Sequence, residues 1–415
     1  MKSNIDALME SKAMSALVIF GAAEHNPPMY YFTGGRHITH ATVVKKRGEA
    51  AVLFHSDIER DEAAKSGLKL IPYSKYDDGA LLEKAGKDIL LSGALRCELM
   101  LRELGVDAGR VGVYGFYDVS ATFGMLSHLQ KLMPEIEFVG EARDESILTR
   151  AMETKEESEV ERIRKMGQIT VNVVGKVADF LTSCNVRDDE VLLKADNSPL
   201  TVGAVHAKIR LWTAEQSAEL PSGFIFAIGR DAGVPHSTGN PADEIRLGKT
   251  IIFDFYPAEA GGGYYYDFTR TWSLGYAPPE AQKLYDEVKT IHAKTIAAFE
   301  LNAPFKKYQQ MTCEYFEALG HQTPLNTKSP VEGYVHSLGH GLGLNIHERP
   351  FCNFLTSDDQ RLVAGVVFTV EPSLYYPEKE MGVRIEDAFW MRPDGKIEIL
   401  AEYSYDFVLP MKKQT

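Results

Sequence analysis

The sequence predicts an α+β fold in two domains, the larger of which contains a curved antiparallel sheet. Its length of 415 residues is more than one ordinary hydrophobic core accommodates. The pattern changes near residue 150, where short β-rich runs give way to a long amphipathic helix. Beyond that helix, strand-like runs are joined by few β-α-β units, which favours an antiparallel sheet over a parallel one.

The first predicted domain, residues 1–150, is a mixed α/β unit. Short runs rich in β-branched and aromatic residues are typical of strands, and turn residues separate them. A glycine closes one helical run at residues 57–67, and a second helical run ends near Met133. The expected strands lie at residues 15–20, 29–34, 41–46, 50–55, 68–73 and 110–116.

The second predicted domain, residues 151–415, begins with the long helix over residues 154–181. Thr154 and Glu157 have the spacing of a capping box at its start. The alternative is that this helix lies inside one large domain. Apolar residues recur on one face at three-residue steps: Val160, Ile163, Met166 and Ile169.

Extended segments dominate the rest of the second domain. Two helices, near residues 279–301 and 304–319, interrupt them. The extended segments are expected at residues 223–229, 250–257, 264–275, 366–376 and 382–390.

Composition and charge exclude several classes of function. An apolar fraction of 44% and a charged fraction of 25% are those of a globular protein. The formal net charge of −13 argues against nucleic acid as a partner, because phosphate neutralisation requires a basic surface. No apolar run is long enough to cross a bilayer, and the first residues are polar where a secretory signal would be apolar. We therefore expect a cytoplasmic protein without a membrane partner, whose four widely spaced cysteines are reduced.

Two aspartates interrupt apolar strand-like runs. Asp254 lies in "IIFDFYP" and Asp267 in "YYYDFTRT", on either side of a turn with three glycines. Pairing these runs around residues 260–261 places the two carboxylates directly opposite each other. Such carboxylates repel each other unless they are protonated or share a cation. The alternative is an aspartate at a strand end with ordinary hydrogen bonds.

Two glutamates raise the same question. Glu371 in "FTVEPSLY" and Glu386 in "GVRIEDAFW" lie in apolar β-runs, where glutamate is depleted. Side-chain alternation places Arg384 and Glu386 on one strand face. A salt bridge between these two residues is therefore an alternative to a metal site.

A histidine-rich and glycine-rich segment, "HSLGHGLGLNIHERP", spans residues 336–350. Each glycine costs a helix about 1 kcal/mol, so we expect a loop whose backbone packs closely and whose imidazoles point at a ligand. Four carboxylates and an imidazole suit two divalent cations, with manganese first and cobalt, zinc or iron as alternatives. Two such ions about 3.5–4 Å apart would polarise a substrate carbonyl and activate water.

Together these motifs make the sequence resemble the pita-bread metallopeptidases, the group of methionine aminopeptidase, aminopeptidase P and prolidase. The motifs occur in order along the chain, as a strand aspartate, "YDFTRT", "GHGLG", "VEPSLY" and "RIED". The resemblance covers nearly the whole chain and implies a C-terminal pita-bread catalytic domain. It implies five ligands for two metal ions: Asp254, Asp267, His340, Glu371 and Glu386.

The resemblance also implies catalytic and substrate-binding residues. His236 in "GRDAGVPHS" matches a histidine that hydrogen-bonds the scissile region, and His347 in "NIHERP" matches one that meets the peptide from the other side. His336 matches a substrate-side residue of the proline-specific members. Arg384 either holds Glu386 or binds a substrate carboxylate, and Glu371 is implied as proton shuttle. A histidine satisfied by ordinary hydrogen bonds is the alternative for each imidazole.

A large N-terminal domain is typical of the proline-specific branch, so residues 1–150 are expected to be a creatinase-like N-terminal domain. The implied activity is hydrolysis of the bond between an N-terminal residue and proline, in proline-containing peptides. An Xaa-Pro aminopeptidase is our first expectation and an Xaa-Pro dipeptidase the alternative, with a homodimer in either case. The rival classes are a metal-dependent hydrolase or lyase of non-peptide substrates and a binding module without catalysis.

Three features depart from the family pattern. The hairpin between Asp254 and Asp267 is two residues longer than usual, which keeps both carboxylates on one face because the strand period is two. Tyr266 replaces the usual serine before Asp267, and Ser373 replaces the glycine that follows "EP". Neither change removes a ligand, but both are expected to reshape the site.

Overall fold

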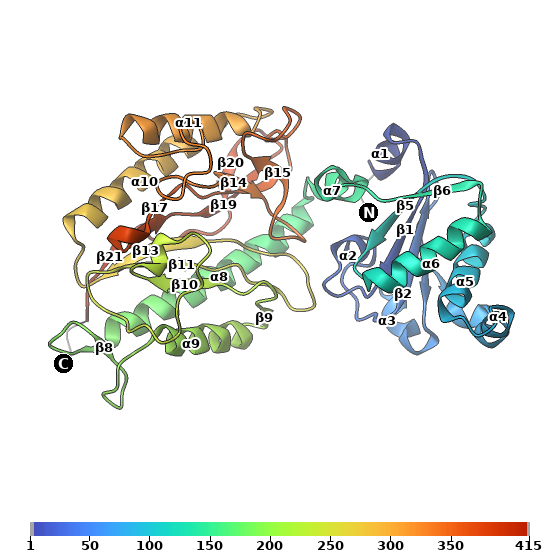
Figure 1. The fold of residues 1–415 in the computed structure, drawn as a ribbon, viewed down its shortest axis with the longest axis horizontal. Helices are drawn as coiled ribbons and strands as arrows, with labels where there is room; N and C mark the ends of the chain where they lie inside the picture. The colour runs from blue at the N-terminus through green and yellow to red at the C-terminus, as the bar shows by residue number, and fades with distance from the viewer. Residues whose placement is uncertain (1–3, 413–415) are drawn as a thin grey trace. The chain divides into compact units, whose positions relative to one another are not determined.

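The structure, a computed structural model, describes residues 4–412, so that the outermost residues of both predicted domains, 1–3 and 413–415, lie outside it. The chain divides into two compact units (Figure 1). The first contains the residues up to Met152 together with Gly261–Gly263. The second contains Glu153–Ala260 and the residues from Tyr264 onward. The creatinase-like identity of residues 1–150 stays a prediction.

The first unit is built on a six-stranded mixed sheet. Its strands are β1 (Met14–Gly21), β2 (Ala41–Lys46), β3 (Val52–His55), β4 (Lys69–Pro72), β5 (Gly109–Gly115) and β6 (Ile136–Val139). They are ordered β4-β3-β2-β1-β5-β6. β1 pairs antiparallel with β2 and parallel with β5, so the sheet changes from antiparallel to parallel pairing at this strand.

Seven helices accompany this sheet in the part of the first unit that the structure describes. They are α1 (Ile5–Ser11), α2 (Pro27–Thr33), α3 (Arg60–Ala64), α4 (Asp78–Lys84), α5 (Ile89–Glu103), α6 (Val119–Leu132) and α7 (Ile147–Met152). The carboxylates of Asp77, Asp88 and Asp118 cap α4, α5 and α6 by accepting backbone N–H groups of the first turn. Apolar residues of these three helices and of the sheet form one core.

The run at residues 29–34, predicted as a strand, belongs instead to helix α2. Pro27 and Pro28 stand in its first turn, where the missing N–H costs nothing and the fixed φ suits a helix. Gly34 ends it in the left-handed conformation, with φ of 68°. The proline and glycine signals on either side therefore outweigh the β-propensity of the aromatic residues between them.

The second unit contains two main sheets of four and five strands. The first is ordered β10 (Ile225–Ile228), β11 (Thr250–Asp254), β13 (Thr269–Leu274) and β21 (Val408–Leu409). The second is ordered β15 (Glu348–Cys352), β14 (Gly339–Gly341), β16 (Val367–Val370), β19 (Asp387–Met391) and β20 (Ile397–Ile399). Within them only β13 and β21 pair in parallel, which agrees with the predicted α+β class.

Three short two-stranded sheets and four helices complete the second unit. The strand pairs are β7 (Asn185–Val186) with β8 (Leu192–Leu193), β9 (Ala218–Glu219) with β12 (Ala258–Glu259), and β17 (Ser373–Tyr376) with β18 (Met381–Arg384). The helices are α8 (Glu157–Ser183), α9 (Val202–Glu215), α10 (Pro279–Ala298) and α11 (Lys306–Ala318).

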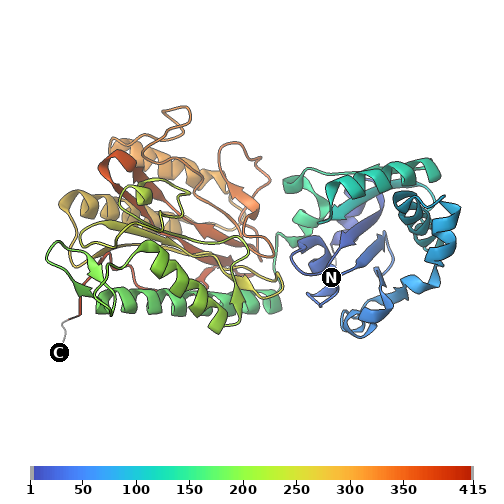
Figure 2. The same cartoon turned by 60° about the horizontal axis from the view of Figure 1, so that its bottom comes forward.

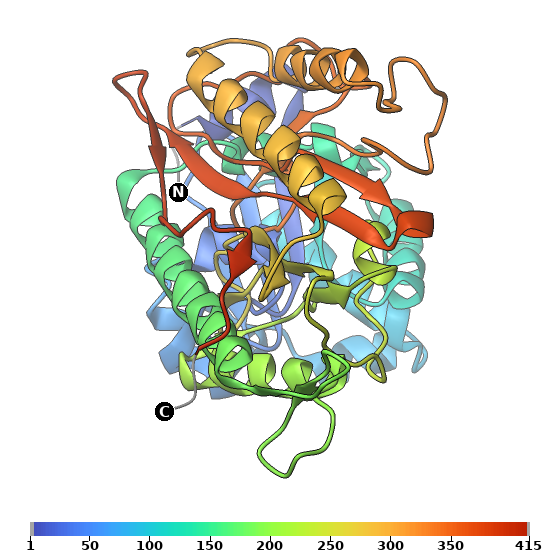
Figure 3. The same ribbon diagram turned by 90° about the vertical axis from the view of Figure 1, so that its left-hand side faces the viewer.

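The helices of the second unit lie on both sides of its strands. Figure 2 shows α8 and α9 on one side and α10 and α11 on the other. Figure 3 shows α10 running across the C-terminal strands. Apolar residues of α10, such as Leu284 and Val288, share a core with Leu374 of β17 and Val383 of β18. This packing fixes the strands that carry the candidate site.

Helix α8 begins later than the sequence predicts. Thr154 forms an isolated bridge with Val366, and the backbone N–H of Lys155 donates to the carbonyl of Gly365 over 2.7 Å. Because these bonds keep the chain extended, Glu156 becomes the N-cap residue. It forms the capping box with Glu159, so the predicted box of Thr154 and Glu157 is wrong.

The four cysteines form no disulfide in the structure, and Cys97, Cys313 and Cys352 are buried. Among residues 4–412, no helix combines the length and the apolar character that a transmembrane segment requires.

Candidate metal centre

Asp254 and Asp267 lie on one β-hairpin, as diagonal neighbours. Asp254, at the end of β11, pairs with Thr269, the first residue of β13. The predicted pairing was therefore wrong, and the turn is centred one residue later. Gly261 and Gly262 have φ of 87° and 82°, which places the reversal between them. Since strand side chains alternate, Asp267 still faces the same side as Asp254.

Glu371 and Glu386 each lie at the junction between two strands. Glu371 separates β16 from β17, and Glu386 separates β18 from β19, so neither run is the single strand that we predicted. Pro372 has no N–H to continue the β16 ladder. The N–H of Glu371 donates to Leu338, over 2.7 Å, and the N–H of Glu386 donates to Thr269, over 3.0 Å. Each carboxylate is thus fixed at the point where the chain changes its pairing partner.

His340 lies on strand β14, although we predicted a loop. A Cβ atom at Gly339 would lie 2.1 Å from the carbonyl oxygen of Thr369, and one at Gly341 would lie 1.9 Å from that of Arg349. Only glycine lets β14 fit between its neighbours β15 and β16. The glycines that argue against a helix therefore allow an interior strand to pack tightly against both of its neighbours.

The His340 ring is oriented with Nε2 toward two carboxylates. Nδ1 lies 3.1 Å from the carbonyl oxygen of Gly341, which can only accept, so this nitrogen carries the proton. Nε2 lies 3.6 Å from Asp267 Oδ2 and 3.6 Å from Glu371 Oε1. This orientation presents a lone pair to the carboxylates, as a metal-binding imidazole requires.

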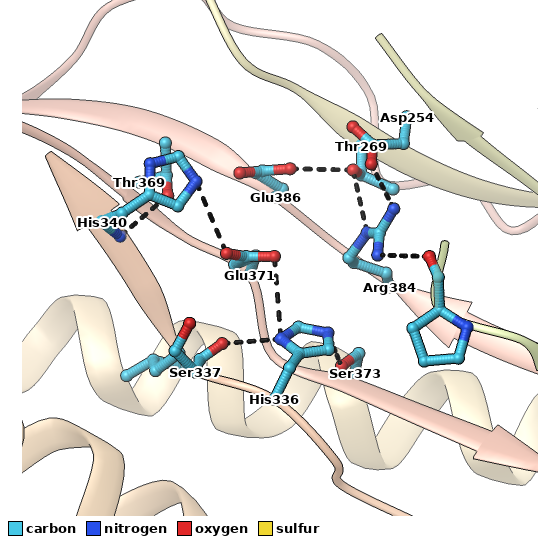
Figure 4. A network of polar contacts seen from close by, with 12 residues as sticks. Asp254, Thr269, His336, Ser337, His340, Thr369, Glu371, Ser373, Arg384 and Glu386 are labelled. Atoms are coloured by element: carbon cyan, nitrogen blue, oxygen red, sulfur yellow. Dashed lines mark hydrogen bonds and ion pairs between the residues drawn. The ribbon is translucent and has the colours of Figure 1, made fainter. Parts of the chain in front are cut away.

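The structure brings all five predicted metal ligands together. Figure 4 shows four of them with their polar neighbours. Asp254 Oδ1 and Glu386 Oε1 are buried without a hydrogen-bond partner in the described part of the chain. Buried carboxylate oxygens of this kind require a cation or a proton. Three overlapping groups have ligand atoms within 4.8 Å of one another: Asp254, Asp267 and Glu386; His340, Glu371 and Glu386; and Asp267, His340 and His347.

Burial and mutual repulsion shift the pKa values of these carboxyl groups upward. Burial, followed by the charge of Asp254, raises the pKa of Glu386 to about 8. Burial and then Glu386 raise the pKa values of Asp267 and Glu371, and burial raises that of Asp254 in spite of Arg384. The cluster thus holds protons that divalent cations can replace, and an oxygen-rich set with one imidazole fits such ions.

Arg384 pairs with Asp254, and the predicted salt bridge with Glu386 does not form. Its Nη2 contacts Asp254 Oδ2, and its Nη1 donates to the Tyr375 hydroxyl over 2.8 Å. Arg384 and Glu386 do face the same side, since both side chains contact the Thr269 hydroxyl, but the guanidinium is taken by Asp254. The guanidinium is only 2% exposed, which leaves it little access to a substrate.

Thr269 is a site residue that the sequence analysis missed. Its hydroxyl donates to Glu386 Oε2 over 2.8 Å and accepts from Arg384 Nε at 3.2 Å. The available signal was the strand period, because Asp267 and Thr269 are two residues apart in "DFTRT". Thr269 thereby links the hairpin to Glu386.

The three remaining predicted histidines differ in their surroundings. His347 is exposed, and its ring lies 4.2 Å from that of His340 in an edge-to-face arrangement. His236 is exposed in the turn after the 3-10 helix η4 (Asp231–Gly233), near enough to Asp254 and His336 to influence their pKa values. His336 is half-buried, with Nδ1 3.8 Å from Glu371 Oε2. Burial, and then Arg384, lower the pKa of His336 to about 3.

A buried ion pair anchors the segment that carries His347. Lys155 Nζ contacts Glu348 Oε1, and both side chains are almost completely buried. A Cβ at Gly343 would lie 2.3 Å from the same Glu348 oxygen, so the segment wraps tightly around this carboxylate. The exposed His347 is therefore attached to a backbone segment that this ion pair holds in place.

The two substituted family positions are both buried. The Tyr266 ring fills space beside helix α8, where a Cβ at Gly167 would lie 2.6 Å from it. Ser373 begins β17, and its Oγ lies 2.7 Å from His336 Nε2. Tyr266 thus packs in the core beside helix α8, away from the candidate ligands. Ser373 instead contacts His336, which lies beside Glu371.

Comparison with known proteins identifies the family. The sequence pattern of metallopeptidase family M24 matches residues 161–393, which is more than half of the chain. The chain belongs to metallopeptidase family M24. The predicted family is confirmed, and the matched range contains all five candidate ligands.

Individual relatives of the M24 family support the fold. The probable dipeptidase PepE of Mycobacterium tuberculosis is 29% identical over 253 residues, which cover 61% of this chain and 60% of that relative. An Xaa-Pro dipeptidase from Bacillus anthracis superposes with a TM-score of 0.73 at 20% identity, over 98% of each chain. An X-Pro aminopeptidase from Thermotoga maritima superposes with a TM-score of 0.71 at 19% identity, over 94% of this chain and 97% of that chain. The predicted α+β fold, with a pita-bread domain after an N-terminal domain, is confirmed.

Proposed function

We propose that this M24 protein is a divalent-cation-dependent Xaa-Pro aminopeptidase, which hydrolyses the bond between an N-terminal residue and proline. The observation that carries the proposal is the convergence of four carboxylates and His340 from separate strands and strand junctions. The unpartnered oxygens of Asp254 and Glu386, counted over residues 4–412, support cation binding. The donor set fits two divalent ions, with manganese first and cobalt, zinc or iron as alternatives.

The proposed mechanism assigns separate tasks to the ligands and to the exposed histidines. Bound divalent cations would supply polarisation of the scissile carbonyl and acidification of the attacking water. Glu371 is the proposed proton shuttle, because it combines a raised pKa with a side chain that is 13% exposed. His236 and His347, both exposed, would orient the peptide and stabilise the developing oxyanion.

The state of Arg384 supports an aminopeptidase over a dipeptidase. A dipeptidase must recognise the free carboxylate that follows its proline, and Arg384 is the sequence's candidate for that contact. Its guanidinium is buried and already engaged by Asp254, Thr269 and Tyr375. The second candidate function is the Xaa-Pro dipeptidase, which is favoured by the similarity to the probable dipeptidase PepE of Mycobacterium tuberculosis.

Peptide turnover tests this proposal. The purified full chain would be loaded in parallel with Mn, Co, Zn or Fe and incubated with Ala-Pro, Ala-Pro-Ala and Ala-Ala. We expect release of alanine from Ala-Pro-Ala and little cleavage of Ala-Ala. Cleavage of Ala-Pro alone would favour the dipeptidase, and turnover of no peptide with any of the four metals would refute both.

A matched pair of histidine variants tests the assigned residues. His347→Ala is expected to lower kcat on Ala-Pro-Ala by about 10²-fold or more, because an oxyanion donor is lost. His37→Ala is the control, since His37 is an exposed histidine of the first unit that pairs with Glu24. Equal activity of the two variants would remove His347 from the mechanism. The homodimer and the cytoplasmic location stay predictions.

A further inference from the structure

Two hydroxyl groups converge on one nitrogen of His336. Ser373 Oγ lies 2.7 Å from His336 Nε2, and the Tyr375 hydroxyl lies 3.0 Å from the same atom. Both hydroxyl-bearing residues are completely buried on β17, and they share a face because they are two residues apart. Figure 4 shows Ser373 beside the His336 ring.

A count of donors and acceptors assigns the protons of this group. His336 Nδ1 lies 2.7 Å from the carbonyl oxygen of Ser337, which can only accept, so Nδ1 carries the proton in the neutral ring. Nε2 then offers a single lone pair. Arg384 Nη1 donates to the Tyr375 oxygen over 2.8 Å, which leaves the phenol proton free to be donated. Two hydroxyl donors therefore reach a single acceptor.

Each hydroxyl reaches the lone pair of Nε2 by itself, Ser373 Oγ at 2.7 Å and the Tyr375 hydroxyl at 3.0 Å. With glycine at position 373, as in the family pattern, Tyr375 would be the only hydroxyl available to Nε2. The serine of this chain adds a second way to occupy the lone pair.

We propose that Ser373 is a positioning residue that shares with Tyr375 the fixing of His336, so that either hydroxyl alone keeps Nε2 occupied and the ring in place. With both ring nitrogens hydrogen-bonded, His336, whose side chain is 21% exposed, offers a substrate no free nitrogen. Resting on the proposed function, in which His336 is a substrate-side residue, the two hydroxyls would fix the orientation in which its ring meets the peptide.

Nitrogen spectra of histidine side chains test the assignment without any metal or substrate. The full chain would be labelled with ¹⁵N-histidine, kept metal-free, and His336 identified by its loss in His336→Gln. The variants are Ser373→Ala, Tyr375→Phe and both together. The control is Ser273→Ala, because Ser273 is a buried serine of β13 whose hydroxyl donates to the Tyr276 carbonyl over 2.6 Å.

We expect the proton on Nδ1 and a hydrogen-bonded Nε2 in the wild type, in both single variants and in the control. In the double variant, the Nε2 resonance should move to the position of a free imidazole nitrogen. A proton on Nε2 in the wild type, release of Nε2 by Ser373→Ala alone, or an unchanged double variant would each overturn the proposal. If the double variant does not fold, the wild type and Ser373→Gly still test the proposal. A proton on Nε2 in the wild type, or release of Nε2 in Ser373→Gly, would overturn it.

Kinetics with Mn and Ala-Pro-Ala provide the functional readout. The double variant should raise KM about fivefold beyond the product of the two single effects, the factor expected for one hydrogen bond, with kcat nearly unchanged. Tyr375→Phe also removes the hydroxyl that accepts a hydrogen bond from Arg384. This loss occurs both in the single and in the double variant, so it cancels in the double-mutant cycle. Purely multiplicative effects would contradict shared fixing. If the wild type cleaves no peptide, the proposed function fails, while the spectra still decide the role of Ser373.

Discussion

Arg270 and Asp387 form a completely buried ion pair, with Arg270 Nη2 2.8 Å from Asp387 Oδ1. The same guanidinium donates to the carbonyl oxygens of Thr269 and Glu386 over 3.0 and 2.9 Å. Each residue of the pair directly follows one of these site residues along the chain. The pair therefore holds the start of β13 against the junction that carries Glu386.

Removal of one partner of this pair should damage both stability and metal binding. Arg270→Met removes the cation from the buried Asp387 carboxylate and leaves Tyr405 and His292 beside it, and such a loss typically costs about 3–5 kcal/mol. We expect weaker Mn binding as well, because Glu386 loses its backbone support. Urea unfolding and calorimetric Mn titration measure the two effects. Arg187→Met, which removes an exposed pair with Asp189, is the control and should change little.

The glycines around His340 should not tolerate a methyl group. Gly341→Ala forces a Cβ against the Arg349 carbonyl and displaces β14, so we expect a loss of about 1–3 kcal/mol or more and at least tenfold weaker Mn binding. Gly140→Ala is the matched control, since among residues 4–412, apart from its chain neighbours, nothing lies within 4 Å of its added Cβ. A Gly341→Ala variant as stable as Gly140→Ala would show that β14 is not tightly packed.

The raised pKa of Glu386 predicts a pH dependence of the metal-free protein. The pKa rises from 4.5 to about 8 on folding, so the folded state binds a proton that the unfolded chain releases. This stabilisation is fully present below pH 4.5 and is lost as the pH rises through about 8, at roughly 1–2 kcal/mol per pH unit for one proton. Urea unfolding between pH 5 and 8 in the presence of a chelator measures it.

Added Mn should reverse this trend, because the cation binds the deprotonated carboxylates and its affinity rises with pH. Glu386→Gln should flatten the metal-free dependence. A metal-free stability that increases between pH 5 and 8 would contradict the raised pKa values.

Tyr266 and Gly167 should behave as a coupled pair. Gly167→Ala places a Cβ 2.6 Å from the Tyr266 ring in the wild type. In a Tyr266→Ser background the ring is absent and the alanine should cost less, although its contact with Ala401 persists. We expect a coupling of about 0.5–3 kcal/mol in a double-mutant cycle followed by urea unfolding. Additive effects would mean that α8 moves away from the hairpin at no cost.

The fold class and the family were predictable because their signals are patterns of residue type along the chain. Acidic side chains within apolar β-runs stand out whatever the geometry, since burial of a carboxylate requires compensation. The structure brings Asp254, Asp267, His340, Glu371 and Glu386 together, while their roles as ligands stay predictions.

The errors concern pairing partners, which depend on contacts distant in sequence. Helix α2 was mistaken for a strand because its aromatic residues dominate the local pattern. The breaks at Glu371 and Glu386 were missed because the apolar runs continue through them, although the chain moves to another sheet. The partner of Arg384 was missed because Asp254, which takes its guanidinium, lies 130 residues away along the chain.

Two of the candidate ligands lie on different sheets. Asp254 ends a strand of the four-stranded sheet, and His340 lies within the five-stranded one. A cation held by both would have its binding site only in the folded second unit. Its binding would then raise the free energy of unfolding by about 2.7 kcal/mol at a free cation concentration of one hundred times Kd. A fall in cation supply would therefore enlarge the unfolded fraction of that unit and shorten the survival of the chain against proteases.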